Sequence, residues 1–131
     1  MKRLARLGGT DGQALVEFAL VLPLLLLVLF GVIEFGMLFF TTLTLNEAAR
    51  DAARYASVGA SDAQIVQVVQ QDCATLDTAE LTVLVSPPAG SQVTGDPVTV
   101  TVEYPDTLFP SISGLPSGTL LLKARITMRM E

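Results

Sequence analysis

The chain of 131 residues contains no histidine, no tryptophan and a single cysteine. Without histidine it lacks the commonest general base and metal ligand of proteins. A single cysteine forms neither an intramolecular disulfide nor a cysteine-rich metal site. There is no glycine-rich phosphate loop, and Ser111, Ser113 and Ser117 have no base to activate them. The sequence therefore predicts a protein that is not an enzyme and that holds no metal or cofactor.

Charge is also scarce, and it is missing altogether from one long stretch. Charged residues make up 16% of the chain, and none lies between Phe18 and Ile33. Beyond Glu34 the apolar stretch continues to Phe40. A helix of this length rises on the order of 34 Å, which is enough to cross a hydrocarbon core of about 30 Å. The sequence therefore predicts one membrane-spanning helix, over about residues 16–40, surrounded by membrane lipid.

The charges around this stretch predict its orientation. Lys2, Arg3 and Arg6 precede it, opposed by Asp11, whereas the charges that follow it nearly cancel. Because positive charge beside a span stays in the cytoplasm, we expect a cytoplasmic N-terminus in the inner (cytoplasmic) membrane. Residues 46–131 would then be periplasmic or extracellular. The stretch is too long for the apolar region of a removable secretory signal, and no small-x-small cleavage site follows it.

The residues just before the stretch form the most specific motif of the chain. Residues 12–18 read Gly-Gln-Ala-Leu-Val-Glu-Phe, directly after a short basic segment. This arrangement resembles the processing site of type IV prepilins, especially the Flp form, in which glycine is followed after four residues by glutamate and an aromatic residue. The resemblance implies that a prepilin peptidase cuts between Gly12 and Gln13 on the cytoplasmic side, and that residues 1–12 are a leader.

Glu17 would then be the fifth residue of the mature chain, followed by Phe18. A carboxylate near the inner edge of a span is costly unless it is paired, and it usually marks function. The resemblance implies a role for Glu17 and Phe18 in assembly, with Glu17 pairing with the new N-terminal ammonium of Gln13 in a neighbouring subunit. The alternative is that Glu17 is solvated at the membrane surface and favours the start of the helix.

The similarity extends beyond this motif. Pro23 lies inside the apolar run, residues 31–36 read Gly-Val-Ile-Glu-Phe-Gly, and an alanine-rich stretch, Asn-Glu-Ala-Ala-Arg-Asp-Ala-Ala-Arg-Tyr-Ala, follows at 46–56. Together these residues look like the N-terminal region of the TadE-like family of tight-adherence pilus proteins.

This resemblance implies a minor pseudopilin of a Tad/Flp-type pilus, taking part in assembly at the inner membrane or within a surface fibre. The implied partners are a prepilin peptidase, other pilin or pseudopilin subunits, and Tad inner-membrane assembly proteins. The alternative is an unprocessed single-pass scaffold or adhesin of the same secretion system.

Glu34 lies inside the apolar stretch, about 24 Å along the helix axis from Phe18. That distance places it near the outer face of the membrane. Glu34 either reaches water at this face or makes a polar contact within the membrane. Gly31 and Gly36 on either side would allow another backbone to approach closely.

The helix is expected to continue beyond the membrane, over residues 13–59. Leucine and alanine recur there at helical spacing, and Gly59 offers a stop; the recurring residues are Leu45, Ala49, Ala52 and Ala56. A second helix is indicated by the capping box of Ser61 and Gln64, followed by an apolar face. This face comprises Ile65, Val68, Val69, Cys73 and Leu76. Cys73 is then a buried thiol or, alternatively, forms an intermolecular bridge.

Three later segments alternate between apolar and polar residues, as half-buried strands do. They are Leu81–Val85, Val98–Tyr104 and Leu120–Met130, and the proline-rich stretch Pro105–Gly118 is expected to be a loop or an edge crossing. The predicted fold class is α+β: the long helix continues into a small pilin-like exported domain, residues 60–131. This domain would contain a short helix and an antiparallel sheet of three strands or, alternatively, four.

The charge balance argues against binding to nucleic acid. Removal of residues 1–12 takes away three basic side chains and Asp11, which leaves 5 basic against 12 acidic side chains, a net charge of −7. Such a surface repels phosphate. We therefore expect no nucleic-acid partner.

Overall fold

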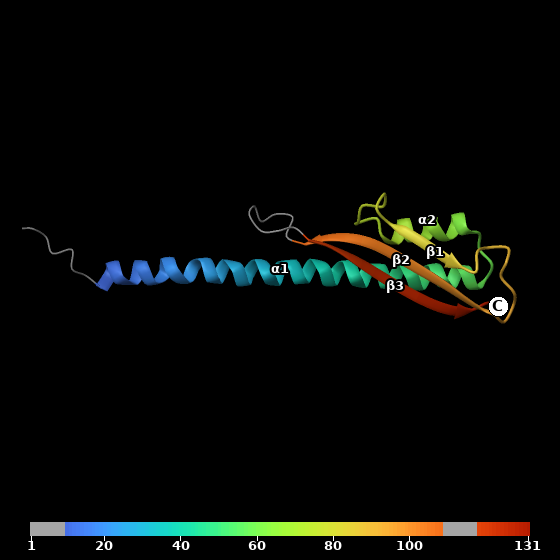
Figure 1. The fold of residues 1–131 in the computed structure, drawn as a ribbon, viewed down its shortest axis with the longest axis horizontal. Coiled ribbons are helices and arrows are strands. Elements are labelled where there is room, and N and C mark those ends of the chain that lie inside the picture. The colour runs from blue at the N-terminus through green and yellow to red at the C-terminus, as the bar shows by residue number, and fades with distance from the viewer. Residues whose placement is uncertain (1–9, 109–117) are drawn as a thin grey trace, which may run out of the picture. The chain divides into compact units, whose positions relative to one another are not determined.

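The computed structural model describes residues 10–108 and 118–131, which form two helices and three strands (Figure 1). The elements in chain order are α1 (Thr10–Ser57), α2 (Asp62–Asp72), β1 (Thr82–Ser86), β2 (Pro97–Leu108) and β3 (Gly118–Arg129). The chain divides into two compact units, Met1–Gly36 and Met37–Glu131, and α1 contributes to both.

The first unit consists of the apolar part of α1. Its residues are mostly leucine, valine and phenylalanine, and α1 is long and apolar enough to cross a membrane. Pro23 lies inside the helix. A proline removes one backbone hydrogen bond, and this is tolerated in membrane helices because neighbouring groups satisfy the freed carbonyl. The predicted long apolar helix is therefore confirmed.

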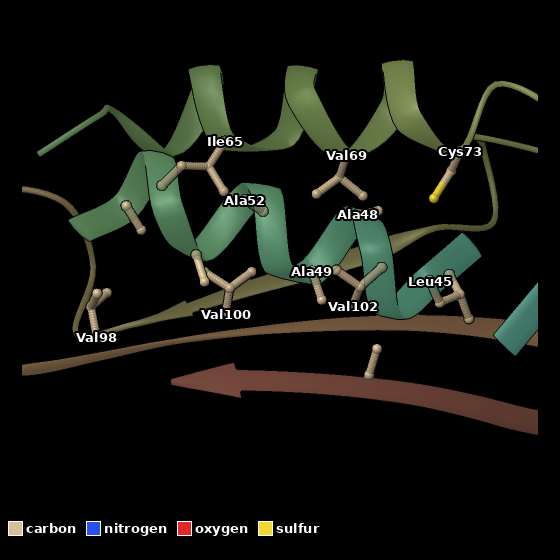
Figure 2. Packing of buried hydrophobic residues seen from close by; sticks show 13 residues of the cluster. Leu45, Ala48, Ala49, Ala52, Ile65, Val69, Cys73, Val98, Val100 and Val102 are labelled. Carbon is tan, nitrogen blue, oxygen red and sulfur yellow. The ribbon is translucent and has the colours of Figure 1, made fainter. Parts of the chain in front are cut away.

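In the second unit, the alanine-rich end of α1 forms the centre of the core. Figure 2 shows this part of α1 lying between α2 and β2. Ala48 and Ala52 lie toward Val69 and Ile65 of α2, and Ala49 lies toward Val102 of β2. Because partners cover α1 on two sides, its small side chains are fully buried and let the neighbouring elements approach closely. The buried α1 residues are Leu45, Ala48, Ala49, Ala52, Ala53 and Ala56.

Helix α2 begins at the predicted capping box. The Ser61 hydroxyl accepts a hydrogen bond from the Gln64 backbone N–H (3.4 Å), and the Gln64 side-chain oxygen accepts one from the Ser61 backbone N–H (3.0 Å). Two of the unpaired N–H groups at the helix start are thereby satisfied. Ile65, Val69 and Cys73 are buried on the face toward α1. The predicted second helix is therefore confirmed, with Ile65 and Val69 of its predicted apolar face buried. Cys73 and Leu76 reach the core from beyond the end of the helix, and Val68 is half-buried.

The three strands form an antiparallel sheet in the order β1-β2-β3. Valines of β2 alternate into the core, and β1 and β3 add further apolar side chains on the same face. Val98, Val100 and Val102 are buried, together with Ala124 of β3. On the other face the Lys123 ammonium lies 2.6 Å from the Glu103 carboxylate, and the Thr99 and Thr127 hydroxyls are 2.8 Å apart. The predicted α+β fold with a three-stranded sheet is confirmed within the described residues.

The sheet differs from the prediction at the end of β2. We expected a loop or an edge crossing from Pro105, but β2 continues to Leu108, and Pro105 pairs with Leu121 of β3. The pairing of β1 with β2 reaches only to Glu103. Among the described residues, no strand pairs with this edge of β2 beyond Glu103, and a proline, which lacks the backbone N–H, is tolerated at such an edge. The remainder of the expected loop, residues 109–117, lies outside the described residues.

Candidate functional site

The predicted processing and assembly residues lie on the first turns of α1. The side-chain amide of Gln13 donates a hydrogen bond to a carboxylate oxygen of Glu17, over 3.0 Å. Residues four apart lie above one another on a helix face, so this contact follows directly from their spacing. Phe18 is the next residue and is exposed. The structure therefore brings Gln13 and Glu17 together on the helix surface, whereas Phe18 points in another direction around the helix.

Gly12 occupies a position that the fold does not require to be glycine. It lies inside α1, and a methyl group built on its Cα would meet no atom within 4 Å. Glycine within a helix is about 0.5–1 kcal/mol less favourable than alanine. Within the described residues, neither a positive φ nor a close contact accounts for glycine at this position.

The segment that follows presents apolar side chains all around the helix. Every leucine, valine, isoleucine and phenylalanine from Leu15 to Phe35 is exposed, apart from Leu22, which is half-buried. An exposed apolar surface of this extent requires a lipid or protein environment. A helix that is apolar on all sides is typical of a membrane span. The segment is therefore suited to anchoring the chain in a membrane.

Glu34 lies seventeen residues beyond Glu17, which corresponds to about 25 Å along the helix axis. Its side chain is half-buried. A methyl group built on Gly31 or Gly36 would meet no atom within 4 Å, so both glycines leave open space on the helix surface. The polar contact predicted for Glu34 within the membrane remains a prediction. Glu17 and Glu34 lie at opposite ends of the apolar segment.

Several polar side chains at the end of this segment form hydrogen bonds with the backbone of their own helix. The sequence analysis did not predict these bonds. The hydroxyls of Thr41 and Thr42 donate to the carbonyl oxygens of Met37 and Leu38, at 3.1 and 2.8 Å. Thr44 and Asn46 make the same bond to the residue four before each of them, at 3.0 and 2.8 Å. Such bonds satisfy polar side chains without water. The run Thr-Thr-Leu-Thr at 41–44 could have indicated these bonds, because threonine hydroxyls within a helix often bond to the carbonyl four residues before them.

The second unit contributes titratable groups but no grouping suited to a metal. Within residues 10–108 and 118–131, no three His, Cys, Asp or Glu side chains are placed to hold an ion. Partial burial, followed by the nearby charges of Asp51 and Glu47, raises the pKa of Asp72 above its usual range. Burial, with a further contribution from Asp72, raises the pKa of the Cys73 thiol to about 11. Cys73 is thus a buried, protonated thiol at neutral pH.

The burial of Cys73 allows a test of whether this residue is a buried thiol or forms an intermolecular bridge. A thiol reacts as its thiolate, so a buried thiol with a raised pKa reacts slowly. At pH 8 we expect a maleimide to label the native protein at least about tenfold more slowly than the denatured protein, since each pKa unit reduces the thiolate fraction about tenfold. Mass spectrometry of timed samples measures the rate. Equal rates in both states would contradict burial, whereas labelling that occurs in the denatured protein only after a reductant is added would indicate an intermolecular bridge.

Comparison with known proteins gives one finding. Residues 12–54 match the model of the TadE-like protein family, and this match begins at Gly12. The matched range covers the apolar segment and most of the alanine-rich part of α1. Neither the curated proteins nor the solved structures that were compared include a match to the chain.

Proposed function

Since residues 12–54 match the TadE-like family, we propose that this chain is a membrane-anchored minor pseudopilin of a Tad/Flp-type pilus. A prepilin peptidase removes residues 1–12, and the mature chain takes part in pilus assembly at the inner membrane or within the fibre. The N-terminus is cytoplasmic, and the domain that follows the span is periplasmic or extracellular. Three basic residues opposed by one acid before the span, against charges that nearly cancel after it, support this orientation.

The observation that carries the proposal is the motif at the start of α1. Gly12, Glu17 and Phe18 stand at prepilin spacing immediately before an apolar segment of membrane-spanning length. Gly12 is unexplained by packing, and a peptidase that needs a small residue at the cut would explain it. The family match beginning at Gly12 supports the same reading.

The test of this proposal is the mass of the N-terminal peptide of the protein isolated from cells. Processing predicts a mature chain that begins at Gln13, and this form should disappear from cells that lack the prepilin peptidase. A chain that begins at Met1 in both strains would instead support the unprocessed scaffold or adhesin, which remains in the membrane fraction.

Glu17 is proposed to act after the cut, in assembly. Once Gln13 carries a free ammonium, that group needs a counter-charge at the membrane edge, and Glu17 of a neighbouring subunit supplies it. For Glu17→Gln we expect normal cleavage but at least about tenfold less protein in the sheared surface fraction, the factor that corresponds to about 1.4 kcal/mol. Quantitative immunoblotting of sheared and membrane fractions measures it.

Glu47→Gln is the matched control, because Glu47 is an exposed carboxylate on the same helix beyond the apolar segment. It should leave the surface fraction unchanged. If Glu17→Gln also reaches the surface at wild-type levels, Glu17 is only a solvated residue at the start of the helix.

A further inference from the structure

Two adjacent leucines at the start of β3 are exposed, unlike the rest of the apolar residues of this strand. Leu120 is 41% exposed and Leu121 is 55% exposed. Successive strand residues point to opposite faces, so both faces of the sheet are apolar at this end. Further along β3 the side chains toward the core are buried or half-buried, and the outer face carries charged and hydroxyl groups. Leu120 was expected in the core and is not there.

These leucines lie beside the part of α1 where the apolar segment ends. A groove of about 290 Å³ is lined by Thr42, Leu45 and Asn46 of α1 and by residues 120–124 of β3. Just before Thr42 come Phe39 and Phe40, which are exposed, and Leu43 is exposed as well. Phe40 and Thr42 are separated by only about 3 Å along the helix axis. The start of β3 is therefore level with the end of the membrane-spanning segment.

The side chains that follow on β3 are the ones expected just outside a membrane. Lys123 is two residues beyond Leu121, about 7 Å along the strand, and Arg125 is two residues further. The Lys123 side chain is 53% exposed although it is paired with Glu103. An apolar end followed by basic side chains is typical of segments that lie at the boundary between headgroups and acyl chains.

We propose that the start of β3, represented by Leu120 and Leu121, is inserted into the outer surface of the bilayer that α1 spans. The argument for lipid as the occupant is continuity with the span: wherever Phe40 meets the edge of the hydrocarbon, these two leucines meet it too. No additional partner is needed to cover them. The inference rests on the membrane anchoring within the proposed function and is independent of cleavage after Gly12.

The absence of tryptophan provides a direct test, because a single introduced tryptophan is a unique fluorescent probe. The full chain carrying Leu121→Trp is reconstituted in vesicles of phosphatidylcholine and phosphatidylglycerol, with or without lipids brominated near the headgroup end of the acyl chains. We expect blue-shifted emission and at least about twofold quenching, because a ring within about 5–10 Å of the headgroup boundary contacts these bromines. Leu120→Trp should behave in the same way.

Val93→Trp is the matched control. Val93 is 61% exposed and lies in the connection between β1 and β2. Gly95 and Asp96 of the same connection form backbone hydrogen bonds with Met130, which directly follows the last residue of β3. Met130 is nine residues from Leu121, about 30 Å along the strand. This tryptophan should show the emission of a water-exposed ring and no quenching by the brominated lipids.

Phe30→Trp separates the inference from its premise. Phe30 lies in the middle of the apolar segment, so its tryptophan should be quenched by lipids brominated near the methyl ends of the acyl chains whenever α1 is in the bilayer. Quenching there, without quenching at Leu120 or Leu121, would overturn the inference and leave the anchor intact. Blue-shifted emission at Leu121 without bromine quenching would mean that protein covers the leucines, and it would overturn the inference as well. No quenching at Phe30 would contradict the anchoring itself.

Discussion

Gly12→Leu is expected to abolish removal of the leader. The new side chain meets open space in α1, so the helix should form as before, while the bond to be cut now follows a bulky residue. We expect the mature form to fall at least about tenfold, which corresponds to about 1.4 kcal/mol of lost transition-state stabilisation. The ratio of uncut to cut protein in cells, measured by intact mass, gives the effect directly.

The control for this variant is Gly36→Leu. Gly36 is also a helical glycine with open space around its Cα, and it lies in the same helix, far from the cut. Cleavage should proceed normally in this variant. If Gly12→Leu and Gly36→Leu are processed equally well, the peptidase does not recognise Gly12, and the unprocessed alternative is favoured.

Ala52→Leu is expected to destabilise the second unit strongly. Ala52 is fully buried and lies toward α2, where a longer side chain has no room. Overpacking of this kind costs about 1–3 kcal/mol. For a unit of this size, each kcal/mol lowers the melting temperature by about 4–8 °C. Near-UV circular dichroism of the full chain in detergent can follow the loss of packing around Tyr104, which packs against the core.

Arg50→Leu is the matched control, because Arg50 is exposed on the same turn region of α1. Within the described residues, no carboxylate lies within ion-pair distance of its guanidinium. The same new side chain at this position should change the melting temperature by no more than about 2–4 °C, since such surface substitutions stay within about 0.5 kcal/mol. Equal losses in both variants would show that Ala52 is not confined by α2.

Features set by neighbours along the chain could be predicted from the sequence. The apolar segment depends on an unbroken run of residues, and the cap formed by Ser61 and Gln64 depends on residues three apart. The alternation of Val98, Val100 and Val102 predicted the buried face of β2 in the same way. Local spacing is sufficient for these features because a helix or strand has a fixed period.

Features that depend on distant segments could not be predicted in this way. The alanine pattern indicated one buried face of α1, whereas Ala48 and Ala53 are buried as well, because α2 and the sheet cover the helix from different sides. Pro105 predicted the end of a strand, but the short reach of β1 left a free edge at which β2 could continue.

The sequence by itself determined the apolar anchor, the motif around Gly12 and Glu17, and the order of helices and strands, because each of these follows from composition or from local period. Only the tertiary structure decided that the start of β3 lies level with Thr42 of α1, leaving Leu120 and Leu121 exposed there. That arrangement results from the pairing register of β2 with β3 and from the packing of the sheet on α1. Register and packing join residues nearly eighty positions apart, and no local pattern in the chain specifies them.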